Sequence, residues 1–162
     1  METAEQPIIS NSCLFFHIES LYRCAIVLSR NAASASDLVQ QTYVRALGSR
    51  NHSRDDSNIR RSLFTILRNI WLEQLHPTQH HLPEDGPHLL WPTMEGDRVL
   101  EAIQQLPGQF REIVALREFA DLSYREIAQV LRCSTRAVKS RLDKARARLR
   151  ILLTDQQVER WP

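Results

Sequence analysis

The sequence predicts an all-α protein made of two small helical domains joined by an extended linker. Apolar residues recur at steps of three and four, strand-like alternation is absent, and one segment crowded with proline and glycine divides the helical stretches. The predicted domains comprise residues 10–75 and 97–153, with the linker at residues 76–96. A composition of 43% hydrophobic and 25% charged residues is that of ordinary globular proteins, which excludes wholesale disorder.

Three amphipathic helices are expected in the first domain. The first runs from Cys13 to Arg30, and we expect Phe15 and Phe16 to join its core. Ser34 and Asp37 have the spacing of a capping box for the second helix, which Gly48 is expected to end in a left-handed conformation. The third helix is predicted to end near Leu75. Buried positions expected in the second and third helices are Val39, Tyr43, Ala46 and Leu47, and Ile59, Leu63, Ile66 and Ile70.

The second domain begins with two short helices and ends in a helix-turn-helix pattern. Ser123 and Glu126 form a second capping box, which predicts a two-turn helix. A tight turn at Arg132 and Cys133 follows, and Ser134 or Thr135 can cap the next helix. The expected inner stripe of that helix is Val138, Leu142, Ala145, Leu149 and Leu152, which leaves mostly basic residues on its outer side.

The basic residues are concentrated in this last pattern. The segment from Arg125 to Arg150 holds nine bases against two acids, a local charge of +7, so the rest of the chain sums to −5. A helix fits the major groove of DNA, and flanking arginines and lysines displace counterions from phosphates. The alternative is a basic amphipathic hairpin that packs on a partner protein or an acidic membrane.

Three sequence blocks resemble one family, the extracytoplasmic function (ECF) sigma factors of RNA polymerase. Residues 106–150 resemble region four of these proteins, the domain that reads the minus-thirty-five promoter element. The blocks DLVQQTYVRAL (37–47) and NIRRSLFTILRNIWLEQL (58–75) resemble the parts of region two that bind core polymerase and read the melted minus-ten element. Gln41 stands where the family usually has glutamate, and Arg132 stands where it usually has glycine, so we expect a positive φ at Arg132.

The resemblance, together with residue chemistry, implies three sets of contacts. Residues expected to read base edges of the minus-thirty-five element are Arg136, Lys139, Ser140, Asp143 and Lys144, and those expected to bind its phosphates are Arg125, Arg141, Arg146 and Arg148. Those expected to bind the minus-ten strands are Asn58, Arg60, Arg61, Thr65, Arg68 and Asn69; Trp71 either stacks on a base or closes the core. Core polymerase is expected to contact Asp37, Leu38, Gln40, Gln41, Thr42 and Arg45.

Enzymatic and metal chemistry is not expected. The chain has no phosphate-binding glycine loop, metalloprotease motif or nucleophile elbow, so we expect no catalytic residue and no cofactor. Three cysteines without a CxxC pair argue against a disulfide framework or a zinc site. The linker histidines His76, His80, His81 and His88 are expected to be solvated rather than metal-bound. We also expect a cytoplasmic protein without membrane insertion, since no apolar run is long enough to cross a bilayer.

Expected partners are core RNA polymerase, promoter DNA and, by resemblance, an anti-sigma factor. Two other functions fit parts of the pattern. A stand-alone regulator would use the helix-turn-helix and keep the first domain for signalling or dimerisation. A sigma mimic would only sequester a regulator. Transcription assays distinguish the three: a sigma factor supports initiation by core polymerase without another sigma, a stand-alone activator needs the holoenzyme, and a mimic supports neither.

Overall fold

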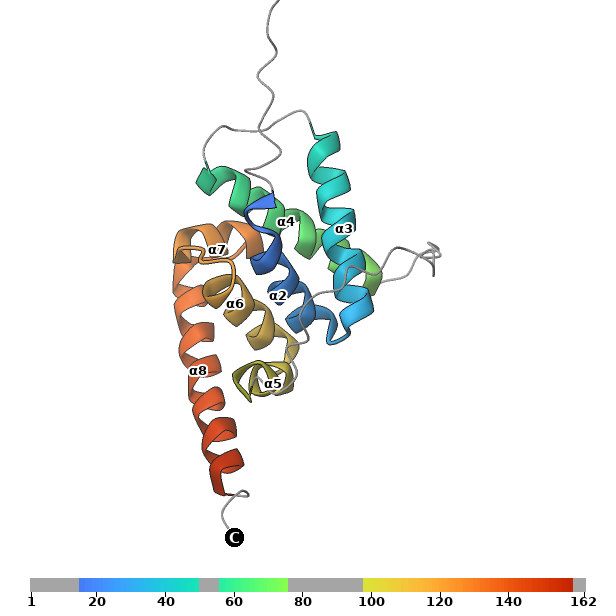
Figure 1. Cartoon of the computed structure of the whole chain (residues 1–162). Helices are drawn as coiled ribbons and strands as arrows, with labels where there is room; N and C mark the ends of the chain where they lie inside the picture. Colours follow the sequence, from blue (N-terminus) through green and yellow to red (C-terminus); the bar gives the residue numbers. More distant parts are fainter. Residues whose placement is uncertain (1–14, 50–55, 76–97, 159–162) are drawn as a thin grey trace, which may run out of the picture.

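The structure, a computed structural model, describes residues 15–49, 56–75 and 98–158, which form helices and no strand (Figure 1). The predicted linker, residues 76–96, and its histidines lie outside this part of the chain. Two groups of helices are present. The first lobe holds α2 (Ile18–Ser29), α3 (Ala32–Gly48) and α4 (Asp56–Leu75). The second lobe holds α5 (Arg98–Gln105), α6 (Gly108–Glu118), α7 (Tyr124–Leu131) and α8 (Thr135–Val158). The all-α prediction is confirmed.

In the first lobe, α2 supplies the centre of the core and residues Leu21, Ala25 and Val27 are fully buried. The helix ends where Arg30 adopts a left-handed conformation and donates its backbone N–H to the carbonyl of Ile26. Phe15 and Phe16, expected in the core, are instead 50% and 82% exposed. They precede α2, so the helical spacing that buries its stripe does not extend to them.

The limits of α3 differ from the prediction at both ends. Asn31, in an extended conformation, is the N-cap, and its side chain accepts a hydrogen bond from the Ser34 backbone N–H at 3.0 Å. The capping box expected at Ser34 is therefore wrong, because a cap three residues earlier already starts the helix. Gly48 stays helical and the chain leaves at Ser49, which is extended, so the left-handed stop is also wrong. Leu47 in the last turn is 53% exposed rather than buried.

The third helix, α4, agrees with its predicted spacing. Ile59, Leu63 and Ile70 are buried as expected, and Ile66 is partly buried. Phe64 and Leu67 are also fully buried and widen the stripe, because α4 is covered by both α3 and α2. Trp71 is partly buried and packs against the same core, as the core interpretation of this residue requires.

The two lobes lie against each other over an extended surface. Helix α2 packs on α6 and α5, and α4 packs on α7, so that α2 lies between the remaining helices of the first lobe and the second lobe (Figure 1). The buried side chains of both lobes merge into one hydrophobic core. This arrangement places α4 beside the helix-turn-helix.

Candidate nucleic-acid and polymerase interface

The helix-turn-helix consists of α7, the turn at Arg132–Ser134 and α8. The capping box at the start of α7 is confirmed: Ser123 Oγ accepts from the Glu126 backbone N–H at 3.2 Å, and Glu126 Oε2 accepts from the Ser123 backbone N–H at 2.8 Å. Arg132 has φ 52° and ψ 48°, as expected for a position where glycine is usual. Ser134 Oγ accepts from the Ala137 backbone N–H at 3.1 Å and caps α8. The two helices are thus fixed by local hydrogen bonds.

One face of α8 is buried and the other carries the residues predicted to read bases. Val138, Leu142 and Ala145 are fully buried on the face that packs against α5, α6 and α7. The five predicted base readers, all exposed in the first turns of α8, are Arg136, Lys139, Ser140, Asp143 and Lys144. Polar side chains near the N-terminus of an exposed helix are suited to reach base edges in a major groove.

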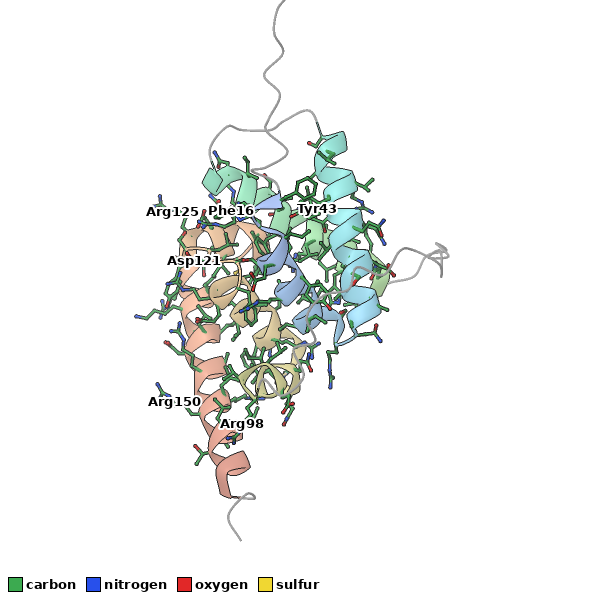
Figure 2. The ribbon with its side chains drawn as sticks, in the orientation of Figure 1. Phe16, Tyr43, Arg98, Asp121, Arg125 and Arg150 are labelled. Carbon is green, nitrogen blue, oxygen red and sulfur yellow. The ribbon has the colours of Figure 1, made fainter. Side chains whose placement is uncertain are left out.

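The four predicted phosphate contacts differ in their surroundings. Arg125 is exposed on α7, and Figure 2 shows it pointing to solvent, whereas Arg141 is partly buried. Arg146 donates a hydrogen bond to Glu118 at 3.4 Å, and its pKa is raised by hydrogen bonding to Tyr124 and to Glu118. The Arg148 guanidinium lies over the Phe110 ring at 4.9 Å from its centroid. Arg146 and Arg148 therefore also hold α8 against α6 and α7.

The residues predicted to bind the minus-ten strands lie along α4, where several already have protein partners. Arg61 donates to Asn58 Oδ1 at 2.8 Å and to Gln129 Oε1 on α7 at 2.9 Å. Arg68 Nε donates to Glu112 Oε1 on α6 at 2.5 Å. Of the others, Asn69 is exposed, and Arg60 and Thr65 are partly buried, with the Thr65 hydroxyl donating to the Arg61 carbonyl at 2.8 Å. Part of this face is thus in contact with the second lobe.

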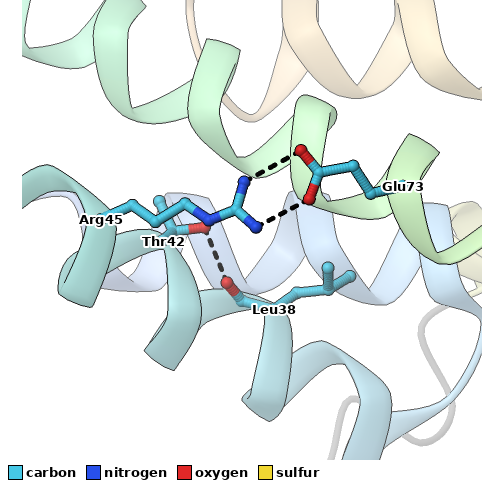
Figure 3. A network of polar contacts seen from close by, with 4 residues as sticks. All are labelled: Leu38, Thr42, Arg45 and Glu73. Atoms are coloured by element: carbon cyan, nitrogen blue, oxygen red, sulfur yellow. Dashed lines mark hydrogen bonds and ion pairs between the residues drawn. The ribbon is translucent and has the colours of Figure 1, made fainter. Parts of the chain in front are cut away.

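The residues predicted to contact polymerase lie on α3 and divide into two groups. Gln40 and Arg45 are exposed, and Asp37 and Gln41 are partly buried. Leu38 and Thr42 are fully buried, and the Thr42 hydroxyl donates to the Leu38 carbonyl at 2.7 Å (Figure 3). These two residues pack α3 into the core of the first lobe and do not reach its outer surface. They are therefore not placed for the direct contact with polymerase that the sequence predicts.

Arg45 forms a bidentate ion pair with Glu73 on α4. Its two terminal nitrogens donate to Oε1 and Oε2 of Glu73 at 3.0 and 2.7 Å, as Figure 3 shows. The hydrogen bonds to Glu73 raise the pKa of Arg45. The pair joins the predicted polymerase helix to the predicted minus-ten helix.

The sequence-based prediction missed functional candidates of two kinds. Val44 and Leu47 are 67% and 53% exposed, and their spacing of four and seven residues from Gln40 places them on its face of α3. That spacing was available in the sequence. Glu73, Glu112 and Gln129 are the partners of Arg45, Arg68 and Arg61, and no local pattern marks them, because each lies 28 or more residues from its partner.

No helix of the described residues is long and apolar enough to cross a bilayer. In the same part of the chain, no group of three or more histidine, cysteine, aspartate or glutamate side chains is placed to hold a metal ion.

Comparisons with known proteins agree with this architecture. The family described as Sigma-70, region 4 matches residues 96–149, which include the helix-turn-helix. The ECF RNA polymerase sigma factor EcfG of Rhodopseudomonas palustris (strain TIE-1) is 32% identical over 145 residues, which cover 84% of this chain and 80% of that protein. RNA polymerase sigma factor SigV of Bacillus subtilis (strain 168) is 28% identical over 153 residues, covering 91% of this chain and 92% of that protein.

A solved structure is similar over nearly the whole chain. It is the sigma factor RpoE in complex with the anti-sigma factor NepR from Bartonella quintana, with a TM-score of 0.67 and 26% sequence identity. The similarity covers 89% of this chain and 96% of that one, so it takes in both lobes. With a helix-turn-helix of the region-four type and a relative that matches most of its length, this chain belongs to the ECF sigma factors of RNA polymerase.

Proposed function

We propose that this chain binds core RNA polymerase in the cytoplasm and directs it to promoters without performing covalent chemistry itself. Residues 10–75 bind polymerase and the minus-ten element, residues 76–96 connect the domains, and residues 97–153 bind the minus-thirty-five element. The observation that carries the proposal is the outer face of α8, where Arg136, Lys139 and Lys144 are exposed opposite a fully buried stripe, in a chain of the sigma family.

In the second lobe, sequence reading and backbone binding fall to different residues. The exposed residues of the first turns of α8 read base edges in the duplex, because they reach furthest into a groove. Arg125 and Arg141 bind flanking phosphates, which position the lobe on any sequence. Arg146 and Arg148 reach phosphates while their contacts with Glu118 and Phe110 keep α8 in place.

In the first lobe, α4 binds the separated strands and α3 binds polymerase. Arg60, Arg61 and Arg68 neutralise phosphates, and Asn58, Thr65 and Asn69 bond exposed base edges. On α3, Asp37, Gln40, Gln41 and Arg45 supply polar contacts to polymerase, and the exposed apolar residues Val44 and Leu47 extend that surface. The Arg45–Glu73 pair holds α3 and α4 in a fixed relative orientation, so that polymerase bound to α3 also positions α4.

An anti-sigma protein is the further partner that we propose for this chain. The similar Bartonella structure is a complex of that kind, and the similarity covers both lobes. Such a protein would hold the chain silent until a signal removes it.

Reconstituted transcription tests the proposal. Core polymerase from the same bacterium is mixed with the full chain and fragmented genomic DNA, and transcript 5′ ends are sequenced. We expect initiation at a defined set of sites that share two sequence elements, with no other sigma present. A Lys139→Ala, Lys144→Ala double variant should lose these sites, and an Asp155→Asn variant, altered at the far end of α8, should keep them.

Two outcomes would contradict the proposal. Initiation only when another sigma factor is added would make the chain a stand-alone regulator. Absence of initiation both with core polymerase alone and with another sigma factor added would make it a mimic.

A further inference from the structure

The exposed face of α8 carries one negative charge among many positive ones. Between Thr135 and Arg150 the chain has seven arginines and lysines and a single acid, Asp143. The Asp143 side chain is exposed. It lies four and seven residues after Lys139 and Arg136, and therefore on the same face of the helix. A DNA duplex held by this basic face would meet a carboxylate near its middle.

The carboxylate of Asp143 does not stabilise the fold. It forms no ion pair or hydrogen bond with any other residue that the structure describes. Asp143 is the ninth residue of α8, too far from the N-terminus to interact with the helix dipole, and aspartate is a poor helix former. Beside DNA it is also repelled by phosphates. A hydrogen-bond donor on a base is the partner that such an acceptor fits.

We propose that Asp143 determines specificity by accepting a hydrogen bond from the N4 amino group of a cytosine in the minus-thirty-five element. This inference deepens the proposed function and rests on it. An ionised carboxylate can only accept hydrogen bonds. In the major groove cytosine presents a donor, whereas guanine and thymine present acceptors, and adenine presents the N7 acceptor beside its amino group. Asp143 therefore attracts cytosine and is repelled by acceptors on the other three bases.

The lysines beside Asp143 have the complementary chemistry. Lys139 and Lys144 are donors, which suit the O6 and N7 acceptors of guanine. Four residues of helix separate Lys139 from Asp143 by about 6 Å along the axis, just under two base-pair steps of about 3.4 Å. We therefore expect the cytosine within about two base pairs of a guanine that the lysines bind.

The same carboxylate should reduce binding to incorrect sites. Where no cytosine is present, Asp143 faces an acceptor or a phosphate and loses its hydration without gaining a partner, which penalises that sequence. The basic residues around it increase affinity for every duplex alike. Discrimination at this position of the promoter thus comes from the one residue of the face that repels most DNA.

Initiation from a promoter library tests the assignment. Holoenzyme reconstituted from core polymerase and the full-length chain transcribes promoters whose minus-thirty-five element is randomised, and sequencing of templates and transcripts gives the base preference at each position. Asp143→Asn is the test variant and Asp155→Asn the matched control. Each removes one negative charge from an exposed site on α8, and Asp155 lies about 18 Å further along the helix. Asp143→Glu keeps the carboxylate.

Wild type, Asp155→Asn and Asp143→Glu should prefer cytosine at one shared position by about tenfold. Asp143→Asn should lose that preference and keep the preferences at the other positions. It should also initiate from promoters with adenine there, which wild type rejects, because an amide can both accept from adenine N6 and donate to N7. A misfolded variant could not produce this gain of activity.

The outcomes separate this inference from the proposed function. If Asp143→Asn and Asp155→Asn show the same preference at every position, Asp143 reads no base, and the inference is wrong while the proposed function stands. Loss of a preference for a base other than cytosine, or loss of initiation from every promoter, would likewise contradict it. If wild type does not initiate from any promoter, the proposed function fails and this inference fails with it.

Discussion

Arg45 and Glu73 join the C-terminal parts of α3 and α4 by two hydrogen bonds, although 28 residues separate them in the sequence. Both side chains remain about half exposed, so water screens the pair and its contribution to stability is small. Its geometric effect is larger, because a planar guanidinium bonded to both carboxylate oxygens fixes the distance and the relative orientation of the two helices.

Loss of this pair should affect polymerase binding more than folding. We expect Arg45→Lys and Glu73→Gln each to lower the free energy of unfolding by about 0.5–1 kcal/mol, with strong coupling in a double-mutant cycle. Urea unfolding measures the stability, and fluorescence titration with core polymerase measures the affinity. If Glu73→Gln, a residue outside the predicted polymerase contacts, leaves that affinity unchanged, the orienting role is excluded.

Arg132 in the turn of the helix-turn-helix should tolerate glycine. A non-glycine residue in the left-handed region costs about 1–2 kcal/mol, and glycine removes that strain but loses about 0.5–1 kcal/mol of chain entropy. We expect Arg132→Gly to keep or raise the melting temperature slightly and Arg132→Val, which is β-branched, to lower it clearly. Calorimetry of both variants checks this. A lower melting temperature for Arg132→Gly than for Arg132→Val would contradict the left-handed conformation of Arg132, with φ 52°.

Base reading and phosphate binding on the second lobe should be separable by mutation. On a site identified by the transcription experiment, Lys139→Ala or Lys144→Ala should cost about 1–3 kcal/mol and weaken the preference for that site. Arg125→Ala should weaken binding to cognate and scrambled duplexes alike and reduce the salt slope by about 0.9. Fluorescence anisotropy at several salt concentrations measures both effects. Equal losses on the two duplexes for every variant would remove the base-reading assignment.

Arg146 should behave differently from Arg125, because it is engaged with Glu118 and Tyr124 inside the lobe. We expect Arg146→Ala to reduce both DNA affinity and the melting temperature, whereas Arg125→Ala changes affinity alone. If Arg146→Ala leaves the melting temperature unchanged, the contacts of Arg146 with Glu118 and Tyr124 do not stabilise the lobe.

Stability should fall at alkaline pH because of the buried thiol of Cys24. Burial raises the pKa of this thiol well above its ordinary value of 9.0, so the folded protein keeps a proton that the unfolded chain releases. The free energy of unfolding is therefore unaffected below about pH 8 and declines as the pH rises above about 9. Burial raises the pKa values of Tyr43 and Tyr22 as well, which adds to the decline above about pH 10. Urea unfolding at a series of pH values measures this decline. A free energy of unfolding that rises at alkaline pH would contradict burial of the Cys24 thiol as its cause.

Elements whose signals are local could be predicted from the sequence. The capping box at Ser123 and Glu126, the turn at Arg132 and the buried stripe of α8 each depend on residues a few positions apart. The capping box and the turn are found in the structure. The stripe is found too, with Val138, Leu142 and Ala145 buried and Leu149 and Leu152 partly buried. The signal at Ser34 does not mark the start of α3, because several residues near it can cap a helix and Asn31 is the N-cap.

Contacts between the lobes could not be predicted in the same way. Glu112 and Arg68 lie 44 residues apart, and nothing in the sequence around either residue indicates the other. The burial of Leu38 and Thr42 has a local signal instead, because they stand at steps of four before the buried Ala46, although they share a family block with exposed residues.

The shared hydrophobic core has a consequence for the lifetime of the protein in the cell. Neither lobe is large, and a domain of about 60 residues buries only about 60% of its unfolded surface, so each depends on the apolar face of the other. Any molecule that separates the lobes must also shield those faces, or the chain becomes a substrate for proteolysis and aggregation.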